Sequence, residues 1–320
     1  MLSRPNIILR LITKSWIVFV QAIILSFESI VVEFLTEIHG ISSLLVAGIG
    51  ISIPLAGMIL LFISTVLSKK ITVFKSWKLL LLASILLAAA VFLWYDSVTR
   101  VGASKEGLLA GPLETIVVLI LAWLLLKEKL RRIQLVGVII ALLGFFATVS
   151  SRSLDLSTIV PLVITFGDLE AILSAFAFAG GVIVMTKIVK RHTTIEVTGA
   201  SLLISGLILV ILLVVLTSET SIPTIQEWIL LVSFSLLPLA AALLYVIGLD
   251  RIGASLTSTI ASSNILFTLF LQLIFKGLGV KTNLPENILL ALIGGALGLF
   301  GIYLLHIEKD YLLRKKKIGN

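Results

Sequence analysis

The feature that most constrains this chain is a series of long apolar segments, each about as long as a helix that crosses a lipid bilayer. A hydrocarbon core of roughly 30 Å requires about 20 apolar helical residues, and one run reads LLLLASILLAAAVFLWY. The chain is 59% hydrophobic and 13% charged, whereas soluble domains carry about 25% charged residues. We therefore predict an all-α polytopic membrane protein with ten transmembrane helices, at 16–36, 43–67, 77–98, 104–126, 131–149, 168–188, 196–217, 227–249, 255–275 and 286–306.

The basic residues are distributed unevenly between the loops that join these segments. If the amino terminus lies in the cytoplasm, 20 of the 25 Lys and Arg residues fall on the cytoplasmic side. The exceptions are Arg100, Lys105, Arg152, Lys276 and Lys281. The positive-inside rule then predicts a multi-pass protein of the cell (plasma) membrane with both termini cytoplasmic. The net charge of +8 is explained by this orientation, and the RKKK run at 314–317 is expected to contact membrane lipids and not nucleic acid.

Two nearly identical pentapeptides, RVGAS at 100–104 and RIGAS at 251–255, mark an internal repeat. The same offset of 151 residues aligns Trp77 with Trp228 and Ser84 with Ser235. We predict a first repeat at 1–150 with five helices, and a second at 151–320 with five helices and a basic cytoplasmic tail. Because five is odd, the two repeats enter the membrane with opposite polarity, as in many secondary transporters. Within each turn, Gly allows the chain to reverse and Ser is expected to cap the next helix.

These motifs resemble the drug/metabolite transporter superfamily, and specifically its ten-helix EamA-type branch. The run AAAVFLWYDSVTRVGASKEGLLAGPLETIVVLILAW, the KEKL junction that follows it and the second-half run AAALLYVIGLDRIGASLTSTIASSNILFTLFLQLIF carry the resemblance. It implies a secondary transporter or exporter of small metabolites, in which helices 1 to 4 and 6 to 9 surround a cavity that opens alternately to each side. The sequence departs from the family pattern in three places: the opening helix is unusually acidic, Pro112 corresponds to Ser263 in the second copy, and Glu128 of the KEKL junction corresponds to Gly279.

Two carboxylates near the predicted membrane midplane, Glu28 and Glu114, are the main candidates for a site. An acid at the centre of a membrane helix costs about 2.5 to 3.5 kcal/mol on insertion scales, so such residues are usually functional. Gln21 lies on the same face of its helix as Glu28, and Gly111 lies on the same face as Glu114. Either acid could carry a proton or bind an amine on the substrate. The alternative is that each acid only forms hydrogen bonds between helices.

The second half offers polar groups without charge at the corresponding depth. Ser262, Asn264 and Tyr245 are the candidates for substrate contact, although Ser and Thr also commonly bond to carbonyls of their own helix. Trp94 and Tyr95 are expected to belong to an interfacial aromatic belt. Other residues carry weaker expectations: solvation of Glu33 near the outer surface, helix kinks at Pro54, Pro112 and Pro238, and close helix packing at Gly137, Gly144 and the glycines of 294–301.

From the sequence we predict transport of small neutral, zwitterionic or cationic cargo of amino-acid or amine type, driven by proton coupling or exchange. The absence of a basic residue near the predicted midplane argues against anionic cargo. A facilitative or lipid-handling protein on the same fold and a non-transporting membrane sensor remain alternatives. The glycines at 137, 144 and 294–301 could also pack between two subunits, so a homodimer is a second alternative for them. We expect no enzymatic activity, cofactor or metal site, because the chain has no Cys, no phosphate-binding loop and no suitably spaced His.

Overall fold

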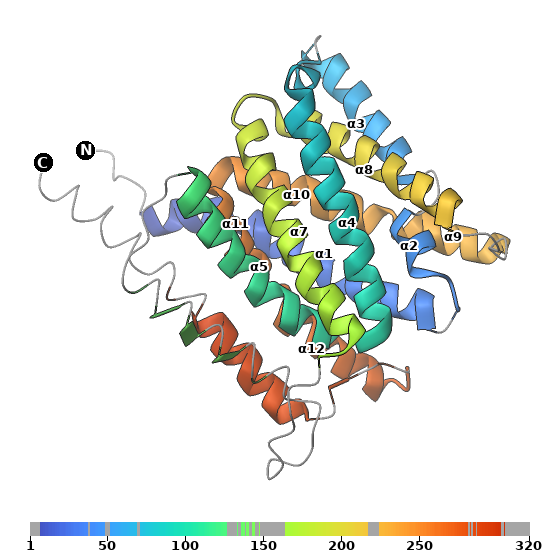
Figure 1. The fold of residues 1–320 in the computed structure, drawn as a ribbon, viewed down its shortest axis with the longest axis vertical. Coiled ribbons are helices and arrows are strands. Elements are labelled where there is room, and N and C mark those ends of the chain that lie inside the picture. The colour runs from blue at the N-terminus through green and yellow to red at the C-terminus, as the bar shows by residue number, and fades with distance from the viewer. Residues whose placement is uncertain are drawn as a thin grey trace, which may run out of the picture.

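The computed structural model describes residues 7–37, 39–48, 52–68, 71–126, 164–216, 224–280 and 287–301, together with scattered positions between 133 and 147, between 282 and 285, and at 304. Within these residues the regular structure is entirely helical (Figure 1). The elements are α1 (Ile7–Glu37), α2 (Ser43–Gly48), α3 (Ser52–Ser68), η1 (Val73–Ser76), α4 (Trp77–Val101), α5 (Ala103–Leu126), α7 (Phe166–Val189), α8 (Thr194–Leu216), α9 (Ile225–Phe234), α10 (Leu236–Ile252), α11 (Ala254–Ala261) and α12 (Asn264–Gly277). A further apolar helix covers Ile288–Gly301.

Seven of the described helical stretches are long and apolar enough to cross a membrane. They are Trp16–Glu37, Val73–Val101, Ala103–Leu125, Phe166–Val189, Thr194–Val215, Ile225–Ile252 and Thr257–Gly277. The apolar helices Pro54–Leu67 and Ile288–Gly301 are shorter and fall on the second and tenth predicted segments. The predicted segment 131–149 lies largely outside the described residues, so the number of ten helices stays a prediction. Large apolar side chains such as Leu67 and Val214, 71% and 74% exposed, lie on the outside of the bundle, as lipid contact requires.

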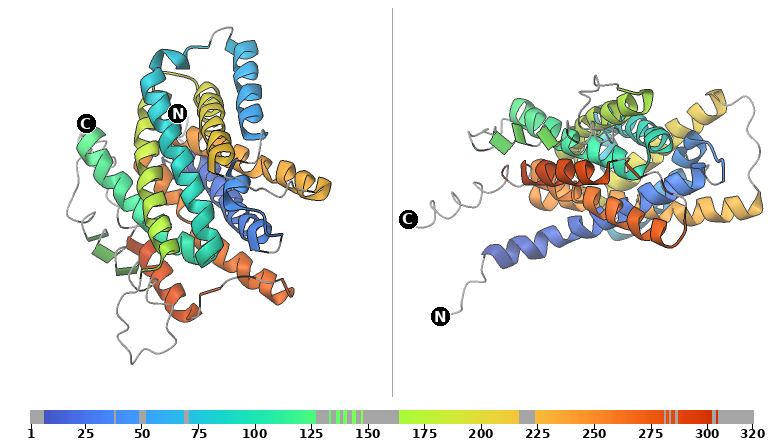
Figure 2. Two further views of the ribbon diagram at one scale, coloured as in Figure 1. Left: turned by 45° about the vertical axis from the view of Figure 1, so that its right-hand side comes forward. Right: turned by 90° about the horizontal axis from the view of Figure 1, so that it is seen from below.

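Helices of one predicted repeat pack mainly against helices of the other. Figures 1 and 2 show α4 beside α7 and α3 beside α8, and α1 also packs against α10. At the offset of 151 residues, α7 corresponds to α1, and α10 corresponds to α4. The contact of α4 with α7 is therefore repeated, with the two halves exchanged, in the contact of α10 with α1. This symmetry is expected for a duplicated unit. The boundary at residue 150 lies outside the described residues and stays a prediction.

The two similar turns adopt the same backbone conformation. Gly102 between α4 and α5 has a φ of 85°, and Gly253 between α10 and α11 has a φ of 84°, a region that residues with a Cβ rarely adopt. The Gly102 N–H also donates to the carbonyl oxygen of Val98, at 2.9 Å. The expected capping by Ser is wrong for the second turn, because the N-cap of α11 is Gly253, with no side-chain cap. Both turns therefore depend on their glycine.

Two of the three prolines expected to kink a helix, Pro54 and Pro238, lie just after the start of a new helix, whereas the kink expected at Pro112 is absent. The α5 helix continues through Pro112, whereas the corresponding Ser263 lies at the break between α11 and α12. Pro238 is in the first turn of α10, immediately after a break at Ser235, and Pro54 is in the first turn of α3. A proline is tolerated in the first turn of a helix, where its missing N–H would have no helical partner. For the pair Pro112 and Ser263, the break is therefore in the copy without the proline.

Glycines allow close contacts between helices in the described part of the chain. A Cβ on Gly57 of α3 would lie 2.5 Å from the backbone nitrogen of Leu203 and 2.6 Å from the carbonyl oxygen of Gly199, both in α8. A Cβ on Gly144 would lie 2.5 Å from the carbonyl oxygen of Gly294. At Gly144 the predicted close packing therefore occurs within one chain.

We expect Gly57→Ala to lower the free energy of unfolding by about 1 to 3 kcal/mol, because the methyl group would force α3 and α8 apart. The measurement is the thermal denaturation midpoint of the purified protein in detergent. Gly277→Ala is the matched control, because a Cβ there meets nothing within 4 Å and Ala is the better helix former. Equal denaturation midpoints for the two variants would contradict the close contact.

Candidate functional site

A cavity of about 190 Å³ lies between the helices of the two predicted repeats. It is smaller than the roughly 300 Å³ at which pockets for drug-sized ligands begin. Its walls come from α1, α4 and α5 of the first repeat and from α7, α8, α10, α11 and α12 of the second. All the sequence-predicted site residues line it, namely Gln21, Glu28, Gly111, Glu114, Tyr245, Ser262 and Asn264. Their roles in binding stay predictions.

Glu28 is held by a tyrosine that the sequence analysis placed elsewhere. The Tyr95 hydroxyl donates to Glu28 Oε1 at 2.6 Å, and Tyr95 itself is fully buried between the rings of Trp94 and Phe234. Trp94 is also buried, 7% exposed, so the expectation of an interfacial belt is wrong for both aromatic residues. Their rings pack against Phe178 of α7 and Phe234 of α9.

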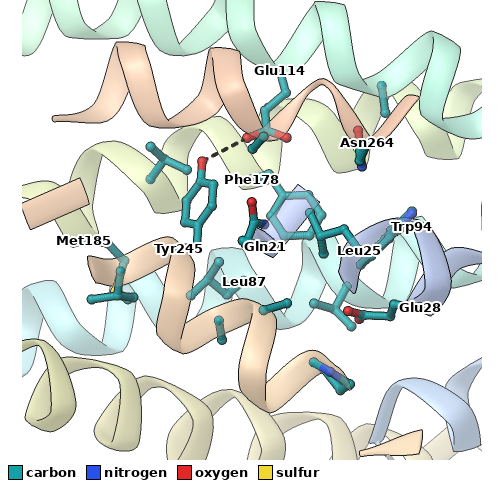
Figure 3. A pocket seen from close by; sticks show the side chains of 18 of the residues that line it. Gln21, Leu25, Glu28, Leu87, Trp94, Glu114, Phe178, Met185, Tyr245 and Asn264 are labelled. Carbon is teal, nitrogen blue, oxygen red and sulfur yellow. Dashed lines mark hydrogen bonds between the residues drawn. The ribbon is translucent and has the colours of Figure 1, made fainter. Parts of the chain in front are cut away.

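Glu114 occupies the other end of the cavity. Figure 3 shows the Tyr245 hydroxyl directed at its carboxylate, and this hydroxyl donates to Glu114 Oε1 at 3.3 Å. Gly111, one turn earlier in α5, lies against Ile265 and Ser262, because a Cβ at Gly111 would meet both side chains. The glycine therefore lets α5 approach the break between α11 and α12.

The predicted polar residues of the second half are largely used in contacts between helices. Ser262 Oγ lies 2.7 Å from Thr115 Oγ1, 2.9 Å from the carbonyl oxygen of Ser258 and 3.3 Å from that of Gly111. This agrees with the alternative in which serines bond to backbone carbonyls. Asn264 accepts through its backbone carbonyl from Ser26 Oγ at 3.0 Å, which ties α12 to α1.

Several oxygens in the cavity wall have no hydrogen-bond partner within the described part of the chain. They are Gln21 Oε1, Glu28 Oε2 and Asn264 Oδ1. Gln21 and Glu28 are each only 2% exposed. A buried acceptor without a donor costs about 1 to 3 kcal/mol. Such atoms are therefore candidates for contact with a ligand that donates hydrogen bonds.

The expected solvation of Glu33 is wrong. Glu33 is 3% exposed, and its Oε2 accepts from the backbone N–H of Ala103 at 3.1 Å and from the side-chain amide of Gln272. It supplies an acceptor for the first N–H group of α5, which has no partner within the helix. Glu33 therefore fixes the start of α5 against α1 and α12, outside the cavity lining.

The sequence analysis missed a third carboxylate, Glu106. It lines the cavity and is 3% exposed. It lies near the start of the predicted segment 104–126, away from the predicted midplane where the candidate acids were sought. A signal was present in the sequence, since Glu106 precedes Glu114 by eight residues in one apolar segment.

The basic residues closest to these acids are already paired with other acids at the end of the bundle. Lys105 Nζ lies 3.0 Å from Asp168 Oδ1. Arg100 lies 2.9 Å from Asp96 Oδ2 and 3.0 Å from Glu170 Oε2. Among the described residues that line the cavity there is no Lys, Arg or His. The cavity wall is therefore acidic.

Comparisons with known proteins agree with the resemblance seen in the sequence. The model described as "EamA-like transporter family" matches residues 13–150 and 165–306. A solved structure titled "Crystal structure of protein" aligns over 92% of this chain and 98% of that chain, with a TM-score of 0.65 and 17% identity. This second match shows a shared fold alone. The chain matches none of the curated proteins.

We expect Tyr95→Phe to destabilise the protein more than Tyr245→Phe does. The first substitution removes a 2.6 Å donor from a buried carboxylate, and about 1 to 3 kcal/mol is expected for such a loss. The second removes a longer bond of 3.3 Å, which is worth less. Thermal denaturation in detergent measures both, and an equal or greater loss for Tyr245→Phe would contradict this ranking.

Proposed function

Because the chain belongs to the EamA-like transporter family, within the drug/metabolite transporter superfamily, we propose that it is a secondary transporter or exporter of small metabolites. Its cargo is neutral, zwitterionic or cationic, and of amino-acid or amine type. The observation that carries this proposal is the acidic cavity between the two repeats. A site between repeats is what alternating access needs, since rocking one repeat against the other exposes it to each side in turn.

Proton coupling is the drive that suits these residues. Glu28 and Glu114 lie in helices long and apolar enough to cross the membrane, and both line the cavity. A carboxylate that is hydrated when the cavity opens and enclosed when it closes changes its preference for the proton. Either acid can therefore exchange a proton for cargo during the cycle.

The charge of the cavity supports the choice of cargo. An anionic cargo needs a buried cation, and the nearby Lys105 and Arg100 are engaged by Asp168, Asp96 and Glu170. A cargo with an ammonium group instead meets carboxylates that have hydrogen-bond donors but no paired cation in the described lining. This contrast favours amine-type cargo over phosphorylated or carboxylate cargo.

We propose that the protein lies in the plasma membrane and that both of its termini face the cytoplasm. The distribution of Lys and Arg supports it. The turn at Gly102 then faces outward, and the turn at Gly253 faces inward.

The central test is purified protein in liposomes that contain a pH-sensitive dye, screened against amines, amino acids, sugars and nucleosides. We expect cargo-dependent proton flux, reduced at least about tenfold in Glu114→Gln or Glu28→Gln, because the amide has no proton to exchange. Glu227→Gln is the matched control. Glu227 lies outside the cavity in a capping box with Thr224, a motif that accepts Gln equally well. Unchanged flux in both cavity variants would rule out coupling through these acids.

Orientation is tested with single cysteines, because the natural chain has none. We expect an impermeant thiol reagent added outside to label Ile164→Cys but not Arg251→Cys in intact cells. Both positions are exposed, so Arg251→Cys should react once the membrane is permeabilised. The reverse labelling pattern would overturn the proposed topology.

A further inference from the structure

Two helices from different repeats, α4 and α7, lie side by side and run in opposite directions (Figure 1). The end of α4 therefore meets the start of α7, and the segment before α4 meets the segment that follows α7. Polar side chains join the two repeats at both meeting points. The first point lies on the face that is proposed to be outer, and the second lies on the face that is proposed to be inner.

The outer contact, as we call the first meeting point, consists of two ion pairs. Lys105 Nζ lies 3.0 Å from Asp168 Oδ1, and Arg100 Nε lies 3.0 Å from Glu170 Oε2. In both pairs the cation belongs to the first predicted repeat and the acid belongs to the second. Lys105 and Asp168 are only 4% and 1% exposed, so water has little access to this pair.

The inner contact, as we call the second meeting point, is a set of hydrogen bonds around His192. Thr72 Oγ1 lies 2.9 Å from His192 Nδ1, and Ser76 Oγ lies 2.9 Å from His192 Nε2. The Thr72 hydroxyl also donates to Glu196 Oε2 at 3.0 Å. Thr72 and Ser76 precede α4, whereas His192 and Glu196 follow α7. These bonds therefore also join the two repeats.

Helix packing alone does not require the ion pair of the outer contact. The duplicated contact between α10 and α1 is also present, and at the offset of 151 residues Lys105 and Asp168 correspond to Leu256 and Ile17. The equivalent helices on the inner face therefore pack without this pair. The buried ion pair is a feature of the outer face alone, which indicates a role beyond holding two helices together.

The helices joined by the two contacts also form part of the cavity wall. Trp94 of α4 lines the cavity, as do Phe178 and Met185 of α7. Along each helix these residues lie between the outer contact and the inner contact. Separation of α4 from α7 at one end would therefore open a path from that face to the cavity. Alternating access requires one face to open while the other stays closed.

We propose that the outer and inner contacts are the two gates of the cavity, and that the pair of Lys105 with Asp168 holds the outer gate closed. This inference rests on the proposed transport function and names the contacts that control access to its site. Removal of the Lys105 charge leaves a buried Asp168 without its cation, which is costly. Opening of the outer gate lets water reach Asp168, so the removal favours the outward-open state.

The test is the rate at which an impermeant cationic thiol reagent labels one cavity cysteine, Ala242→Cys. Ala242 lines the cavity, and the natural chain has no cysteine. Intact cells report access from outside, and inside-out vesicles report access from inside. We expect Lys105→Met to raise the outside rate and to lower the inside rate, each at least about fivefold. Thr72→Val removes bonds of the inner contact and should change both rates in the opposite directions.

Lys276→Gln is the matched control, because Lys276 is an exposed cation in the last turn of α12, outside both contacts. It should leave both rates unchanged. Unchanged rates in Lys105→Met would overturn the inference. A rise of both rates would overturn it as well, because a merely loosened protein exposes the cavity to both faces.

If Lys105→Met does not fold, Glu170→Gln tests the same gate. Arg100 keeps Asp96 as its partner in this variant, and its side chain is 48% exposed. Because exposed ion pairs contribute little, we expect a smaller change in the same directions as for Lys105→Met. No change in either rate would contradict the proposal.

Liposome flux separates this inference from the proposed function. Cargo flux in the natural protein, with labelling rates that do not depend on Lys105, would overturn the gates and leave transport in place. Opposed changes of the two labelling rates, without flux of any cargo, would support the gates and contradict transport.

Discussion

A carboxylate buried inside a membrane protein must find its hydrogen-bond donors within the protein, because lipid supplies none. This requirement accounts for how the helices around the cavity are arranged. Tyr95 reaches Glu28, and Tyr245 reaches Glu114. Glu33 instead accepts the first free N–H of α5. Each acid thereby joins its helix to another helix, so the polar contacts that satisfy the acids also fix how α1, α4, α5 and α10 lie around the cavity.

The two repeats contribute different kinds of residue to the cavity. Glu28, Glu106 and Glu114 all belong to the first half. At the offset of 151 residues their counterparts are Ala179, Thr257 and Ile265, none of which is charged. The second half contributes Tyr245, Phe178 and Asn264 to the wall. The helix arrangement is therefore shared by the two halves while the cavity acids belong to one of them, so the cavity has one acidic wall and one neutral wall.

Candidate residues could be predicted from the sequence where their position in an apolar segment indicates that they lie deep in the membrane. Glu28, Glu114 and Gln21 lie in the middle of long apolar segments, and all three line the cavity. Near the ends of the segments, the predicted depth in the membrane does not indicate whether a side chain is buried in the protein. Trp94, Glu33 and Glu106 were assigned to the surface or missed, yet each is less than a tenth exposed. Neighbouring helices extend beyond these positions and cover them, and no pattern within one segment contains that information.

The sequence by itself determined the class of the protein, its helical segments, the duplication and the family, because the length and period of apolar runs and a repeated turn are properties of the chain alone. Only the tertiary structure decided which acids share a cavity and which residue orients each of them. The pairs Glu28 with Tyr95 and Glu114 with Tyr245 are 67 and 131 residues apart in the chain. Such pairs form because helix packing brings a donor on one helix to the acid on another, within the first repeat for Glu28 and between the repeats for Glu114.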